Sequence, residues 1–299
     1  MKNEIFNGVG TALVTPFSGN EIDYLALKGL IQRQIKAGVS AIIVLGTTGE
    51  PATISEIERE KIIKTAIATA DKKIKVIVGC GSNSTSHAIK LYKQAESLGA
   101  DGALIVTPYY NKCTQKGIIE HYKAIASSGE LPIIVYNVPG RTGVNILPET
   151  MLSLAKIKNI NGVKEASGNI EQVLQIFKLV GSKISIYSGE DSLNAIFMSM
   201  GASGTISVLS NVLPKLVVKM CNFSKEKQYE KMFILQRGVH DIIKVLFVEV
   251  NPIPVKAALW HLGLCKNELR LPLTKISKEN FEKLKFELEK IIGQEYDCL

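Results

Sequence analysis

Short runs of β-branched and other apolar residues recur through the first two thirds of the chain. Eight of these runs predict strands, at residues 9–14, 41–45, 75–78, 103–106, 133–136, 161–164, 184–187 and 204–208. Their starts lie 20 to 34 residues apart, which is too far for hairpins and leaves room for a helix after each strand. The pattern therefore predicts repeated strand–helix units.

The segments between the predicted strands have apolar residues at helical spacing. In the first segment, Leu27, Leu30 and Ile31 fall on one face of a predicted helix. The second segment opens with Ser55 and Glu58 in the spacing of a capping box, in which each side chain binds the other residue's backbone N–H. We therefore expect helices, and not irregular loops, between the strands.

Several predicted helices end at a glycine that precedes the next strand, at Gly38, Gly99 and Gly201. Glycine suits this place because the residue after a helix often needs a positive φ. Apolar strands that alternate with helices indicate a parallel sheet buried on both faces, and crossovers between such strands are right-handed. We predict an α/β fold, a (β/α)8 TIM barrel, with a doubly wound open sheet as the alternative.

The strand pattern stops after about residue 225, and helical periodicity replaces it. Helices are predicted at residues 227–248, 254–262 and 277–292. We therefore divide the chain into a barrel that carries the active site, residues 1–225, and a C-terminal helical domain, residues 226–299.

Composition and charge exclude several classes of protein. The chain has 299 residues, of which 46% are hydrophobic, so it can bury a large core. Its net charge of +8 comes mostly from scattered lysines without interleaved aromatic residues, which argues against binding to nucleic acid. Because no apolar run approaches the ~18 residues of a membrane helix and no signal peptide is evident, we expect a cytoplasmic protein that does not bind membranes.

Neither cysteines nor histidines have the spacing of a metal site. The cysteines are Cys80, Cys113, Cys221, Cys265 and Cys298, and the histidines are His87, His121, His240 and His261. The cysteines are odd in number and form no CxxC pair, which also argues against a disulfide framework. Gly79 and Gly81 begin like a dinucleotide-binding motif, but Ser84 stands at the third glycine position. We predict no metal and no nucleotide cofactor.

The candidate chemistry lies after the strands, because TIM-barrel active sites form at the C-terminal ends of the strands. Lys164 ends the sixth predicted strand. A lysine at the end of an apolar strand loses solvation of its ammonium form, which favours the free amine that attacks a carbonyl group. Formation of a Schiff base is the natural use of such a lysine.

Other polar residues at strand ends suit this chemistry. Tyr136 could move protons on and off a carbinolamine, although it could also be a packing or interface residue. The guanidinium of Arg141 could bind a carboxylate at two points, or form a surface salt bridge. Thr47 and Thr48 lie between two glycines and could bind an anion, or be ordinary turn residues.

Three motifs carry a resemblance to a known family: residues 46–50 (GTTGE), 136–143 (YNVPGRTG) and 163–168 (VKEASG). The chain resembles the 4-hydroxy-tetrahydrodipicolinate synthase (dihydrodipicolinate synthase) family, in the pyruvate-dependent class I aldolase superfamily. Residues 251–256 (NPIPVK) and 269–272 (LRLP) extend the resemblance into the helical tail.

The resemblance implies a reaction. Lys164 would form an imine with pyruvate, and the derived enamine would add to L-aspartate 4-semialdehyde in the diaminopimelate route to lysine. Tyr136 would donate and accept protons, and Thr47 would link it to Tyr110, which reaches in from a neighbouring subunit in this family. The imine to pyruvate makes a separate cofactor unnecessary.

The resemblance also implies the binding residues and the assembly. Thr48 would hold the pyruvate carboxylate, and Arg141 would bind the carboxylate of the semialdehyde. Gly189 and Ile206 would line the pocket through backbone groups. Members of this family are typically homotetramers, built as pairs of dimers, so we expect one here.

Two other functions stay open at this point. The first is another pyruvate-dependent class I aldolase such as N-acetylneuraminate lyase, which resembles the same lysine and tyrosine pattern but lacks the Arg-Thr-Gly of residues 141–143. The second is a non-catalytic ligand-binding paralogue. The second function is disfavoured because a retired site does not need all five of Lys164, Tyr136, Thr47, Tyr110 and Arg141.

Feedback inhibition by lysine is expected to be weak or absent. Inhibited members of the family typically carry serine, histidine and glutamate where this chain has Pro51, Arg59 and His87. An effector ammonium would meet a partly positive pocket, even though Asn83 and Tyr109 remain.

Overall fold

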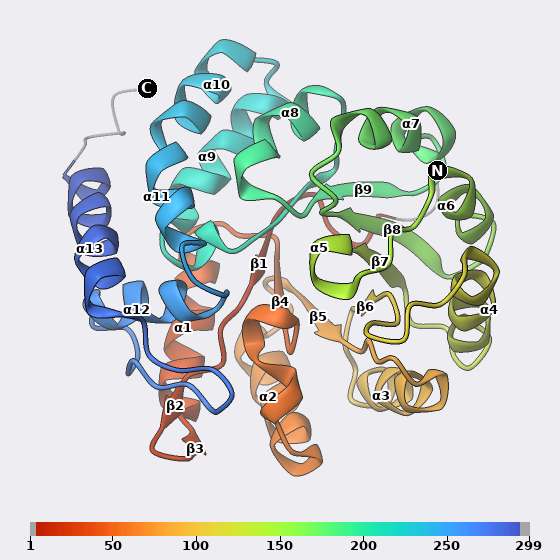
Figure 1. The fold of residues 1–299 in the computed structure, drawn as a ribbon, viewed down its shortest axis with the longest axis horizontal. Helices are drawn as coiled ribbons and strands as arrows, with labels where there is room; N and C mark the ends of the chain where they lie inside the picture. The colour runs from red at the N-terminus through yellow and green to blue at the C-terminus, as the bar shows by residue number, and fades with distance from the viewer. Residues whose placement is uncertain (1–3, 294–299) are drawn as a thin grey trace.

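The computed structural model describes residues 4–293, and eight of its strands close into a parallel barrel (Figure 1). These strands are β1 (Gly8–Ala12), β4 (Ala41–Val44), β5 (Lys75–Gly79), β6 (Gly102–Val106), β7 (Ile133–Asn137), β8 (Ile160–Glu165), β9 (Ser185–Ser188) and β10 (Gly204–Ser207). Around the barrel they follow chain order, and β1 pairs with both β4 and β10. All eight predicted strands and the predicted TIM barrel are confirmed, and the open sheet is excluded.

Helices surround the barrel, as predicted (Figure 1). They are α1 (Tyr24–Lys36), α2 (Glu56–Ala70), α3 (Thr85–Ser97), α4 (Gln115–Ala126), α6 (Pro148–Leu154), α7 (Ile170–Val180), α8 (Asn194–Ser199) and α9 (Pro214–Lys225). Ser55 and Glu58 form both hydrogen bonds of the predicted capping box at the start of α2. Gly38, Gly99 and Gly201 all have positive φ, which confirms their predicted place at helix ends.

The tail also consists of helices, with one difference from the prediction. Its helices are α10 (Tyr229–Gly238), α11 (His240–Leu246), α12 (Ile253–His261) and α13 (Lys278–Ile292). The single helix predicted over residues 227–248 is wrong, because Gly238 is a poor helix former and Val239, with φ −94° and ψ 3°, interrupts the helical backbone. Residues 294–299, with Cys298, lie outside the described residues, and the boundary at residue 225 stays a prediction.

The sequence pattern missed some short elements near the ends of strands. A two-residue strand β2 (Phe17–Ser18) pairs antiparallel with β3 (Glu21–Ile22). Single turns of 3-10 helix form at η1 (Thr47–Gly49), η2 (Pro51–Thr53), η3 (Asp191–Leu193) and η4 (Leu209–Asn211). Elements of two or three residues are too short to show hydrophobic periodicity.

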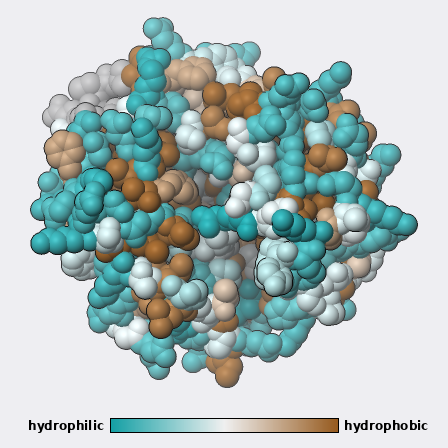
Figure 2. Space-filling view, viewed as in Figure 1, coloured by the Kyte–Doolittle hydropathy of each residue, from teal (hydrophilic) through white to brown (hydrophobic). Residues whose placement is uncertain are grey.

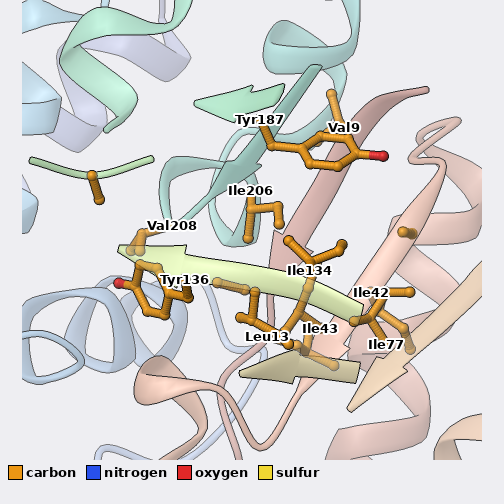
Figure 3. Packing of buried hydrophobic residues seen from close by; sticks show 14 of the residues in the cluster. Val9, Leu13, Ile42, Ile43, Ile77, Ile134, Tyr136, Tyr187, Ile206 and Val208 are labelled. Carbon is orange, nitrogen blue, oxygen red and sulfur yellow. The ribbon is translucent and has the colours of Figure 1, made fainter. Parts of the chain in front are cut away.

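Branched apolar side chains fill the barrel, as Figure 3 shows for Ile43, Ile77, Ile134 and Ile206. The interior is thus a packed core and not a channel, which is usual for this fold. Hydrophilic residues predominate on the face seen in Figure 2, with smaller apolar areas between them. Among residues 4–293, no helix has both the length and the apolar character needed to cross a membrane.

Candidate active site

Lys164 and Tyr136 lie side by side at the C-terminal ends of β8 and β7, where they are directly paired across the two strands. Both side chains are buried, and the Lys164 Nζ lies 4.3 Å from the centre of the Tyr136 ring. Across residues 4–293, no carboxylate forms an ion pair with Lys164. The structure therefore brings the predicted pair together, and the Lys164 amine forms no ion pair in the described part of the chain.

Gly189 directly follows β9, and Ile206 lies on the neighbouring strand β10. A β-carbon at Gly189 would lie 3.0 Å from the Lys164 Cε and 2.7 Å from the Ala166 Cβ, so a side chain here would crowd the lysine. Ile206, on β10, points into the barrel interior (Figure 3). Glycine after β9 thus leaves the space that the Lys164 side chain occupies.

The two threonines of the GTTGE motif lie on η1. Thr48 is buried, and its Oγ1 accepts a hydrogen bond of 2.9 Å from the Nδ2 of Asn251. Because the Thr48 hydroxyl oxygen is the acceptor in this bond, the hydroxyl hydrogen of Thr48 can still be donated to another group. Thr47 is only partly buried. Our sequence analysis placed Asn251 in a matching motif but missed this contact.

A buried charged cluster, which we call the Glu50–Lys256 cluster, connects the same turn to the tail. Glu50 Oε1 and Lys256 Nζ are 2.7 Å apart, and both side chains are almost completely buried. The Lys256 Nζ also lies 4.0 Å from the centre of the Phe17 ring. Burial lowers the pKa of Lys256, and the Glu50 carboxylate opposes this effect. No local pattern indicates this pairing, although both residues belong to the motifs that carry the family resemblance.

Tyr110 and Arg141 are exposed in the single chain. The Tyr110 side chain is 88% exposed, and its φ of 74° lies in the left-handed region. Within residues 4–293, no hydrogen bond joins it to Thr47 or Tyr136. One chain therefore does not assemble the predicted proton relay.

Arg141 belongs to a single helical turn, α5 (Pro139–Thr142). Proline at the first position of a helix and a glycine of positive φ, Gly143, after its end explain this turn. In the described part of the chain, the Arg141 guanidinium forms no salt bridge, so the surface ion pair considered as an alternative is not found.

Glu190 brings a carboxylate to the same end of the barrel. It directly follows Gly189 and is half-buried. Burial raises the pKa of its carboxyl, and the positive charges of Lys164 and Arg141 oppose this rise. The described residues contain no group of three or more His, Cys, Asp or Glu side chains that could hold a metal ion.

Comparisons with known proteins agree with this geometry. Residues 5–291 match the dihydrodipicolinate synthetase family. The 4-hydroxy-tetrahydrodipicolinate synthase of Alkaliphilus oremlandii is 50% identical over 286 residues, which cover 96% of this chain and 99% of that protein. The enzyme of the same name from Thermotoga neapolitana is 50% identical over 94% of this chain and 97% of its own.

Solved structures give the same result. The crystal structure of dihydrodipicolinate synthase from Thermotoga maritima matches with a TM-score of 0.95 and 48% identity, over 96% of this chain and 99% of that chain. A monomeric dihydrodipicolinate synthase variant matches with a TM-score of 0.95 and 47% identity, over 97% and 98% of the two chains. The match of sequence and fold over nearly the full length shows that this chain belongs to the dihydrodipicolinate synthetase family.

Proposed function

We propose that this protein is a 4-hydroxy-tetrahydrodipicolinate synthase that condenses pyruvate with L-aspartate 4-semialdehyde through an imine on Lys164. The observation that carries this proposal is the buried Lys164 amine, which forms no ion pair within residues 4–293 and lies 4.3 Å from the Tyr136 ring centre. A lysine amine in this position can add to a carbonyl carbon and form an imine.

The chemistry follows from these groups. The Lys164 nitrogen adds to the keto carbon of pyruvate, and the carbinolamine loses water to give an imine. Loss of a proton from the methyl group gives an enamine, whose carbon adds to the aldehyde of the semialdehyde. The amino group of the second substrate then displaces Lys164 as the ring closes. Tyr136, in contact with Lys164, is the group placed to move protons in these steps.

Binding of the two substrates uses the groups around this pair. The free hydrogen of the Thr48 hydroxyl can be donated to the pyruvate carboxylate, since Asn251 occupies an acceptor position of the same oxygen. Arg141, exposed and without a salt bridge, is available to the carboxylate of the semialdehyde. The backbone of Gly189 and Ile206 would border the bound pyruvate.

The proposed active form is a homotetramer in which Tyr110 of a neighbouring subunit completes the relay through Thr47. The large exposure of Tyr110 in one chain supports this arrangement. Mixing two inactive variants, Tyr110→Phe and Lys164→Ala, under conditions that exchange subunits should restore part of the activity, because some sites would then receive both intact residues. No recovery in mixed oligomers would count against a shared site.

The proposal is tested by incubating the protein with pyruvate and borohydride and measuring its intact mass, with Lys164→Ala as the control. We expect one reduced pyruvate per wild-type chain and none on the control. An aldehyde screen of aspartate semialdehyde against N-acetylmannosamine then separates synthase from lyase activity. Absence of the adduct on the wild-type chain would overturn the imine mechanism and favour a ligand-binding paralogue.

Lysine is expected to inhibit this enzyme weakly or not at all. Arg59 is buried and its guanidinium is engaged by the Gln94 side chain and the Gly79 carbonyl oxygen, so a fixed positive charge lies where inhibited relatives have histidine. His87 is exposed and supplies no carboxylate for an ammonium group. Initial rates measured with increasing lysine should stay nearly constant, and inhibition at submillimolar lysine would refute this prediction.

A further inference from the structure

The residues that directly follow the reactive pair form a second pair on the other face of the barrel wall. Asn137 follows Tyr136 and Glu165 follows Lys164, and the two are paired across β7 and β8. Because side chains alternate along a strand, Asn137 and Glu165 point outward where Tyr136 and Lys164 point inward. Both outward side chains are completely buried beneath the surrounding chain.

Hydrogen bonds join the two outward side chains and extend to α7. The Asn137 Nδ2 donates to Glu165 Oε2 and to Asn145 Oδ1, each at 2.9 Å. Asn145 and Gln172, the latter on α7, exchange two hydrogen bonds of 2.7 and 3.1 Å. We call these four side chains, Asn137, Asn145, Glu165 and Gln172, the amide–carboxyl network.

Backbone groups complete the network. The Ile146 N–H donates to Asn137 Oδ1 at 3.0 Å, and the Ser167 N–H donates to Glu165 Oε1 at 2.8 Å. Every polar atom of the Asn137 and Glu165 side chains therefore has a partner. Fully satisfied buried networks of this kind fix one arrangement of the elements that they join.

The segment that carries Arg141 is held at both ends by this network. It leaves β7 directly after Asn137 and returns to the Asn137 side chain at Asn145 and Ile146. Residues 138–144, with α5 and Arg141, thus form a loop closed on one buried amide. Movement of Asn137 would shift both the end of β7, with Tyr136, and the base of this loop.

We propose that Asn137 and Glu165 are positioning residues, which hold Lys164 against Tyr136 and couple this pair to the Arg141 loop through Asn145. This inference rests on the proposed function, because it assigns the network a role in that reaction. Small displacements of reacting groups can cost about a hundredfold in rate, so a network that fixes two strand ends has a measurable kinetic effect.

The carboxylate of Glu165 has a feature that glutamine cannot reproduce. Both of its oxygens accept hydrogen bonds from N–H groups, those of Ser167 and Asn137. In Glu165→Gln, one of these donors would face the amide NH2, which is also a donor. The variant keeps the size of the side chain and breaks one link of the network, so it tests the positioning role with little change in volume.

The experiment compares Glu165→Gln and Asn145→Ala with Asn159→Ala as the matched control. Asn159 directly precedes the first residue of β8, and its buried side-chain amide donates three hydrogen bonds. Loss of this amide therefore destabilises the same strand at the end that lies far from Lys164 and Tyr136. For each variant, kcat, both KM values and the rate of borohydride trapping with pyruvate are measured below its unfolding temperature. Wild-type trapping in the same series tests the proposed function independently.

We expect Glu165→Gln to lower kcat and the rate of trapping by about tenfold to a hundredfold. Asn145→Ala should raise KM for the semialdehyde by about tenfold while the trapping rate with pyruvate stays unchanged. Asn159→Ala should lower the unfolding temperature alone. The proposal is overturned if wild-type protein is trapped and turns over normally while both network variants show only the thermal effect of the control. If Glu165→Gln does not fold, the KM for the semialdehyde in Asn145→Ala decides the outcome, because Asn145 is only partly buried.

Discussion

Two buried lysines, Lys164 and Lys256, lie near the same end of the barrel and differ in their partners. The side-chain nitrogen of each lysine lies over an aromatic ring. Lys164 Nζ is 4.3 Å from the centre of the Tyr136 ring, and Lys256 Nζ is 4.0 Å from the centre of the Phe17 ring. Lys256 also has the Glu50 carboxylate at 2.7 Å, whereas Lys164 has no ion pair in the described residues. Both lysines are therefore buried against an aromatic ring, and they differ in that only Lys256 forms an ion pair with a carboxylate.

The difference teaches that burial alone does not identify a nucleophilic lysine. A carboxylate in contact stabilises the ammonium form and makes Lys256 one half of a structural ion pair. Lys164 forms no ion pair within residues 4–293 and has Tyr136, the proposed proton-transfer group, beside it. Substitutions of the two lysines should therefore affect different properties of the protein, catalysis in one case and stability in the other.

The largest expected effect is the loss of activity in Lys164→Met. Without the amine no imine forms, so kcat/KM should fall by more than about a thousandfold. The free energy of unfolding should stay the same or rise, because no carboxylate loses its partner. Steady-state rates and urea unfolding measure the two effects. A clear loss of stability in this variant would contradict the distinction between the two lysines.

The second effect is a loss of stability in Lys256→Met. Removal of one member of a buried ion pair leaves Glu50 without compensation and should cost about 3–5 kcal/mol of unfolding free energy. Lys64→Met, which removes an exposed ion pair with Glu60, is the control and should change stability by less than about 0.5 kcal/mol. Pyruvate trapping on Lys164 should persist in the folded fraction of Lys256→Met. Equal effects of the two substitutions on urea unfolding would show that the Glu50–Lys256 pair is not a special case.

A third test removes both charges of the pair. Glu50→Gln combined with Lys256→Met leaves no unpaired buried charge, so the double variant should regain most of the stability lost in Lys256→Met and lie within about 2 kcal/mol of the wild type. A double-mutant cycle from urea unfolding gives the coupling energy of the pair. Additive losses would mean that the two side chains contribute independently.

The smallest effect concerns the surface side of the same cluster, where Arg270 lies 4.6 Å from the Phe17 ring centre and pairs with Glu58. Hydrogen bonds from Arg270 lower the pKa of Glu58 from 4.5 to about 2. A carboxyl with a lowered pKa in the folded state stabilises the protein above pH 4.5, and this contribution is lost as the pH falls toward 2. As the pH falls from 4.5 toward 2, the midpoint of urea unfolding should therefore decrease less steeply in Glu58→Gln than in the wild type. Parallel plots of midpoint against pH would show that the Glu58 carboxylate does not contribute to stability in this way.

Much of the fold could be predicted from the sequence because its signals are local. Apolar runs of strand length, the capping box of Ser55 and Glu58 and the glycines at helix ends act over a few residues, and each was confirmed. The hairpin of β2 and β3 and the break before His240 were missed, because elements this short have no periodicity to read. Lys164, Tyr136 and Gly189 could be placed together because parallel strands in a barrel end at one rim.

The amino-acid sequence by itself determined the strands, the helices and the residue types that carry the chemistry, since these depend on side-chain periodicity and local hydrogen bonding. Only the tertiary structure decided which polar groups meet. Glu50 and Lys256 are 206 residues apart, and Thr48 and Asn251 are 203 residues apart. Such pairs form when the barrel closes and the tail packs against it, because partners distant along the chain are selected by packing and burial, and local sequence contains no record of that choice.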